Sequence, residues 1–179
     1  VGPAGQLPRR ARRSFTVHKR PAPTTFTLGV VTPGSNSSPT GTRGTDWIEL
    51  SANQCTLYYT SEDTTVRRYN VCTRSALPDF ASGLTAPYCY ALRLRPNGEL
   101  MVACQEAVHR LSSQGTNLRT YTRQSIGETD AAGLFALNLD PDGTSFWTAG
   151  LNSGSVFRVD IESGAVPGSL NSRGGGVGG

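Results

Sequence analysis

Three polar side chains stand at the same place in three similar segments of the chain: Glu49, Arg93 and Asn138. Each has an apolar residue on both sides, so each belongs to a stretch that should be largely buried. A carboxylate, a guanidinium or an amide is costly to bury unless it is paired. We therefore expect these three side chains either to line a central channel or to pair with one another across neighbouring repeats.

The residue types that most often perform catalysis are sparse. Of the two histidines, His18 lies in a basic N-terminal segment and should face solvent. His109 takes a repeat position that holds Arg67 and Phe157 elsewhere, so packing or surface exposure is favoured over a role as a base. The sequence contains no G-x-S-x-G elbow, no histidine-rich metal spacing and no phosphate-binding glycine loop. These features favour a non-catalytic binding or scaffolding function.

Four cysteines, Cys55, Cys72, Cys89 and Cys104, offer a different chemistry. Their even number permits disulfides, and the lack of a C-x-x-C argues against a zinc ribbon or a thioredoxin-like site. Two disulfides would indicate an oxidising compartment, which is extracellular, at the cell surface or periplasmic. The alternative is a cytosolic protein with four buried free thiols.

The expected strand pairing selects the cysteine partners. A hairpin centred near residues 63–64 pairs residues whose numbers add to about 127, which sets Cys55 opposite Cys72 within bridging reach. A turn centred on residues 97–98 gives a sum near 195, whereas the last two cysteines add to 193. A single bulge would bring those two cysteines together.

The elements that carry these residues recur along the chain. Three segments align, 46–70, 90–112 and 135–160, and their corresponding leucines at 50, 94 and 139 are 44 and 45 residues apart. A second motif, Val-x-Arg-apolar-polar, recurs in the same three segments at spacings of 42 and 48 residues. Two motifs that agree on one period indicate an internal structural repeat.

Each repeat contains the same order of short strands. An alternating strand is closed by Asn97-Gly98 or Asp142-Gly143, pairs that accept positive φ in a tight hairpin turn. An apolar strand, a third strand and a weaker fourth candidate follow. Four antiparallel strands in 40 to 50 residues form the unit of a β-propeller blade. The sequence thus predicts an all-β fold of three blades with a period of about 44, at 46–82, 88–123 and 133–170, in an incomplete ring.

Composition and charge divide the chain further. Gly and Pro supply 32 of the 179 residues, which argues against a helical bundle, and no run of 18 apolar residues could span a membrane. Residues 1–45 carry seven basic and no acidic side chains, and they should form a mostly disordered arm with one strand-forming stretch at 25–31. The arginine cluster 9–13 could bind phosphates, but ten arginines against thirteen acidic residues in 46–179 argue against nucleic acid as a partner. Residues 172–179 form a Gly-rich tail.

The repeat resembles a known group of propellers. Its pattern apolar-x-apolar-x-Pro-[Asn/Asp]-Gly, followed by an apolar strand and Val-x-Arg-apolar-[Asp/Ser/Asn], is similar to NHL-type and YVTN-type repeats over residues 46 to about 170. Bacterial secreted or cell-surface proteins often carry such propellers, so the resemblance implies an extracellular module that binds a protein or carbohydrate ligand. The period also fits WD-repeat proteins, but no Gly-His or Trp-Asp dipeptide ends a repeat.

An enzymatic alternative remains open alongside the expected binding function, which needs no cofactor. Gluconolactonase-like and regucalcin-like propellers are metal-dependent hydrolases or lyases whose divalent cation is held by Glu, Asn and Asp from separate blades. Glu49 and Asn138 are of the right type, because oxygen ligands suit Ca or Mg. The chain departs from that family in the stretch 135–138, where the family has an asparagine followed by glycine.

Three blades do not complete a ring, because closed propellers have four or more. Three sources of the remaining blades are therefore open. This chain could be part of a longer protein, a second copy could complete a six-bladed ring, or the residues near Phe26 could begin a fourth, incomplete blade.

Overall fold

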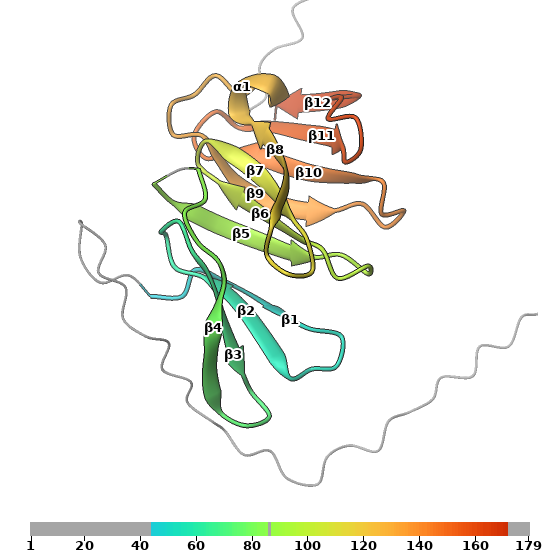
Figure 1. The fold of residues 1–179 in the computed structure, drawn as a ribbon. Helices are drawn as coiled ribbons and strands as arrows, with labels where there is room; N and C mark the ends of the chain where they lie inside the picture. The colour runs from blue at the N-terminus through green and yellow to red at the C-terminus, as the bar shows by residue number, and fades with distance from the viewer. Residues whose placement is uncertain (1–43, 86, 172–179) are drawn as a thin grey trace, which may run out of the picture. The chain divides into compact units, whose positions relative to one another are not determined.

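Three antiparallel sheets of four strands each make up the part of the chain that the computed structural model describes, residues 44–85 and 87–171. In every sheet the strands follow one another in chain order, so each sheet is a simple meander (Figure 1). The all-β prediction is confirmed, and the three described sheets form no closed ring. The cluster 9–13, His18, the stretch 25–31 and the tail 172–179 lie outside the described residues.

The three sheets are called blades 1, 2 and 3. Blade 1 consists of β1 (Trp47–Leu50), β2 (Thr56–Thr60), β3 (Val66–Asn70) and β4 (Ser75–Ala81). Blade 2 consists of β5 (Cys89–Leu94), β6 (Leu100–Cys104), β7 (Ala107–Leu111) and β8 (Asn117–Thr122). Blade 3 consists of β9 (Leu134–Leu139), β10 (Ser145–Gly150), β11 (Ser155–Asp160) and β12 (Gly168–Asn171).

One short helix, α1 (Arg123–Ile126), joins blade 2 to blade 3. Thr122 caps it by accepting a hydrogen bond from the backbone N–H of Ser125 at 3.1 Å, and Gly127 ends it with φ 97°. This helix was not predicted, because a single turn is too short to show a 3.6-residue period.

The hairpin turns at the ends of β5 and β9 differ from the prediction. Only the glycines have positive φ, 86° at Gly98 and 73° at Gly143. The preceding Asn97 and Asp142 instead accept a hydrogen bond, through the side-chain oxygen, from the amide two residues further on, at 3.1 and 2.8 Å. An Asx contact therefore supports each turn, and glycine supplies the left-handed conformation that closes it.

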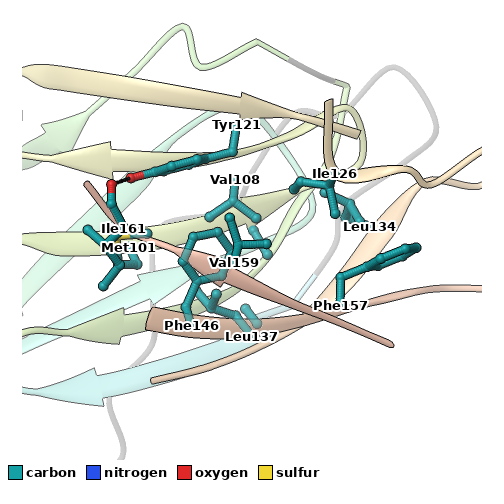
Figure 2. Packing of buried hydrophobic residues seen from close by; sticks show 12 residues of the cluster. Met101, Val108, Tyr121, Ile126, Leu134, Leu137, Phe146, Phe157, Val159 and Ile161 are labelled. Carbon is teal, nitrogen blue, oxygen red and sulfur yellow. Dashed lines mark hydrogen bonds between the residues drawn. The ribbon is translucent and has the colours of Figure 1, made fainter. Parts of the chain in front are cut away.

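Blade 2 supplies the centre of the core. All five residues of β6 are buried, and their side chains alternate between two hydrophobic clusters. Met101 and Ala103 belong to the cluster shared with blade 3, and Leu100, Val102 and Cys104 to the cluster shared with blade 1. Figure 2 shows the first of these clusters, where side chains of both blades interlock. A strand that is apolar along its whole length is thus explained by a sheet covered on both faces.

Candidate functional site

Arg93 joins the three polar residues of the repeat into one cluster. Its Nε donates a hydrogen bond to Oδ1 of Asn138 at 3.1 Å, and its Nη1 lies 3.7 Å from Oε2 of Glu49. The guanidinium also lies over the ring of Trp47, with Cζ 4.6 Å from the ring centroid, in a cation–π contact. The structure therefore brings all three predicted residues together in a chain of contacts across the blades.

The first strand of each blade positions these side chains. Glu49 lies on β1, Arg93 on β5 and Asn138 on β9, and β5 contacts both of the other strands. Of the two arrangements expected, pairing across neighbouring repeats is the one seen among the described residues. That the same side chains also line a central channel remains a prediction, because the described blades do not close around an axis.

The electrostatics of this cluster are centred on Glu49. Partial burial raises the pKa of its carboxyl above the ordinary value. The charge of Arg93 and a backbone hydrogen bond at Leu94 act in the opposite direction, because both favour the ionised carboxylate. Glu49 is therefore a half-buried acid in which burial opposes the ionised form and the neighbouring guanidinium favours it.

A hollow of about 550 Å³ lies beside Glu49, between blades 1 and 2. Its walls come from β1, β2, β5, the turns that follow β1 and β5, and the turn between β7 and β8, and they mix apolar with polar groups. The polar side chains that line it are Glu49, Ser51, Asn53, Tyr58, Arg95 and Ser113. An open hollow of this volume, with a few polar groups and an acid of raised pKa on its walls, is a candidate ligand site.

The cluster does not fit the divalent cation that the enzymatic alternative requires. The amide oxygen of Asn138, the atom that would bind a metal, already accepts the hydrogen bond of Arg93. The guanidinium also lies beside the carboxylate of Glu49, so a fixed positive charge stands next to both candidate ligands. Within residues 44–85 and 87–171, no three His, Cys, Asp or Glu side chains converge in a way that could hold a metal ion.

An aromatic cluster at the start of β5 and β9 did not emerge from the sequence. The ring of Tyr90 lies 5.1 Å from that of Phe135 and 6.4 Å from that of Tyr88, measured between centroids. Tyr90 and Phe135 are 45 residues apart and thus take the same place in the repeat. That spacing could have been used to predict their contact.

His109 is buried and has a packing role. Its Nε2 lies 3.4 Å from the carbonyl oxygen of Thr85, and its Nδ1 lies 3.3 Å from Oγ1 of Thr120. Burial lowers the pKa of the imidazole, so the ring is neutral in the fold at neutral pH. Of the two positions expected from the sequence, packing and surface exposure, the structure shows packing.

The cysteines form the two expected pairs, Cys55–Cys72 and Cys89–Cys104, with Cα atoms 5.1 and 3.8 Å apart. The register differs slightly from the arithmetic. Residues paired between β2 and β3 add to 126 and not 127, and the two cysteines lie just beyond the paired residues, at the open end of this hairpin. Between β5 and β6 the sum is 194, and it falls to 193 beyond a bulge, which places Cys89 directly opposite Cys104.

Comparison with known proteins assigns the fold. No family model matches the chain. The WD40 β-propeller domain of Doa1 is similar in structure, with a TM-score of 0.58 and 17% identity over 71% of this chain and 40% of that one. A chain of the mitotic checkpoint complex is similar too, with a TM-score of 0.58 and 15% identity over 72% of this chain and 37% of that one.

The chain therefore spans less than half the length of these two neighbours. At such low identity the likeness shows the fold alone, and the described residues are β-propeller blades. No described helix is long and apolar enough to cross a membrane.

Proposed function

We propose that the protein is a non-catalytic β-propeller module of the NHL or YVTN kind, which binds a protein or carbohydrate ligand outside the cell. The hollow between blades 1 and 2 carries the proposal. Its volume accommodates a short peptide segment or one or two sugar units, and Glu49, Arg95 and Tyr58 offer it charges and a phenol.

Three further observations support the parts of this proposal. The two disulfides suit an oxidising compartment and so an extracellular location. One structural neighbour is part of the mitotic checkpoint complex, which supports a protein as the ligand. The Arg93 guanidinium beside Glu49 and Asn138 makes a binding role a better account of this cluster than metal-dependent hydrolysis.

A selection experiment tests the proposal. Peptide display and a glycan array would be screened with the full chain, and the binders would be re-measured on two variants of equal size change. Ala52 lines the hollow, so Ala52→Trp should fill it and weaken binding at least about tenfold. Ala131 is exposed on the loop before β9 and lies outside the hollow, so Ala131→Trp should leave binding unchanged.

Two results would contradict the proposal. One is the absence of any selective binder in both screens. The other is a set of binders that Ala52→Trp and Ala131→Trp affect equally, which would place the ligand site elsewhere.

A further inference from the structure

Blade 3 presents a sheet face that, among the described residues, only Trp47 of blade 1 reaches, at the edge next to β9. Register places the side chains of Asn138, Trp147 and Arg158 on this face, since these residues are direct partners across β9, β10 and β11. The opposite face of blade 3 holds Leu137 and Phe146 and packs on blade 2. We call the uncovered side the open face of blade 3.

Blade 1 has the complementary open face. Ile48 and Leu50 of β1 point away from blade 2, and their repeat equivalents are Leu92 and Leu94 in blade 2 and Leu137 and Leu139 in blade 3. Leu92 and Leu137 are 0% and 3% exposed because a preceding blade covers them, whereas Ile48 is 57% exposed. Ile48 thus takes a repeat position that is buried between blades in blades 2 and 3, but among the described residues no blade covers it.

The contact between blades 2 and 3 shows what such an interface contains. Leu137 of blade 3 packs in one cluster with four residues of blade 2, Ala91, Met101, Ala103 and Val108. Their equivalents on the open face of blade 3 are Ala136, Trp147, Ala149 and Val156. These four residues line a hollow of about 140 Å³ on that face, to which Trp47, Leu137, Asn138 and Thr148 also contribute.

We propose that a second copy of this chain docks on these faces, so that Ile48 of each copy enters the 140 Å³ hollow on blade 3 of the other. The hollow is the counterpart of the place that Leu137 fills one blade earlier, and Ile48 is the counterpart of Leu137. One two-fold axis satisfies both open faces of both copies at once, which is the closed arrangement that symmetric dimers favour. Six blades result, within the range of closed propellers.

Polar groups agree with this closure. In the chain of contacts from Glu49 through Arg93 to Asn138, each residue lies next to its equivalent in the adjoining blade. Ring closure brings Asn138 of one copy into the neighbourhood of Glu49 of the other. An amide that can donate would then stand near a carboxylate that can accept, and no like charges would meet.

Multi-angle light scattering on the full chain tests the proposal, with variants of two exposed apolar residues, Ile48 and Leu118, and of the half-buried Trp147. The wild type should have twice the 19.0 kDa mass of one chain. Ile48→Asp and Trp147→Arg should each raise the dimer dissociation constant at least about a hundredfold. Leu118→Asp is the control, because Leu118 is 51% exposed on the edge strand β8 of blade 2; its dissociation constant should stay within about threefold of wild type.

Mixing the two interface variants separates this geometry from other dimers and from misfolding. A mixed dimer has one wild-type contact and one contact that pairs the new carboxylate with the new guanidinium. The mixture should therefore dimerise more tightly than either variant alone. A monomeric wild type, a dimer insensitive to both substitutions, open filaments, or a mixture no tighter than its components would each overturn the proposal.

Discussion

At the scale of single residues, the arginine of the recurring Val-x-Arg motif pairs with a carboxylate in blades 2 and 3 and with a carbonyl oxygen in blade 1. Arg110 pairs with Glu99 at 2.8 Å and reaches Glu162 of blade 3 at 2.8 Å. Arg158 pairs with Asp140 at 2.6 Å. Arg68 donates to the carbonyl oxygen of Pro78 at 3.0 Å and lies over the ring of Phe80. The motif therefore places a cation on the third strand of each blade, where it contacts a polar group of a turn or of a neighbouring strand.

The pairing of Glu99 predicts a loss of stability in acid. Hydrogen bonds from Arg110 lower the pKa of Glu99 from 4.5 to about 2 in the folded protein. Because the folded pKa is the lower one, the pair stabilises the fold above about pH 4.5, and this stabilisation is lost as pH falls toward 2. Glu99→Gln should make the decrease in unfolding free energy over that range shallower, as measured by urea denaturation at several pH values.

Arg110 provides the control for this prediction. Arg110→Met removes only part of this pairing, because Arg95 still pairs with Glu99. The pH dependence of the unfolding free energy should therefore become shallower than in the wild type but stay steeper than in Glu99→Gln. Adding Arg110→Met to Glu99→Gln should change this dependence little further, because the carboxylate that titrates is already gone. If the unfolding free energy fell equally steeply with pH in the wild type and all variants, Glu99 would not be the group responsible for the loss of stability in acid.

At the scale of elements, the two disulfides differ in exposure. Cys89 and Cys104 are fully buried between blades 1 and 2, whereas Cys72 is exposed and Cys55 half-buried. A reductant needs access to sulfur, so mild dithiothreitol on the native protein should open Cys55–Cys72 first and leave Cys89–Cys104 intact until unfolding. Mass spectrometry of alkylated protein over time measures this order. Simultaneous release of four thiols would contradict it.

The close approach between the β7–β8 turn and β4 makes a second prediction at this scale. A methyl group at Gly115 would lie 1.8 Å from the carbonyl oxygen of Phe80 in blade 1, and Gly115 has φ +85°. Gly115→Ala should therefore destabilise the fold by about 3 kcal/mol or more in chemical denaturation. Gly143→Ala is the matched control: its φ is +73° but nothing lies within 4 Å, so only backbone strain of about 1–2 kcal/mol is expected.

At the scale of the whole described region, burial is uneven. β6 is buried along its whole length and β7 at four of its five residues, whereas β1 has no buried residue and β3 has one. Local opening is easiest where few apolar contacts hold the strands. Hydrogen–deuterium exchange should therefore proceed faster in blade 1 than in blades 2 and 3. Uniform protection across the three blades would show that they open as one unit.

The fold was accessible from the sequence because its signals are local. Strand alternation, turn glycines and the 44-residue period all repeat along the chain, and they predicted three four-stranded blades. The equivalence of Glu49, Arg93 and Asn138 was predicted from the same period. Whether these side chains pair or face a channel depends on how neighbouring blades are rotated, which no local pattern records.

Other features of the site depend on longer-range geometry. The 550 Å³ hollow is lined by turns from two blades, so its existence depends on how those turns approach one another. The one-residue error in register at Cys55 and Cys72 arose because turn geometry, and not the position of polar residues, sets the pairing of β2 with β3.

Both disulfides are local, and this has a consequence for how the chain matures and evolves. Each bond closes within a single hairpin, β2–β3 or β5–β6, across 17 and 15 residues. Each disulfide can thus form during synthesis as soon as its own repeat is complete, because neither cysteine needs a partner from a later repeat. Whole repeats can also be duplicated or deleted in the gene without leaving a cysteine that lacks its disulfide partner.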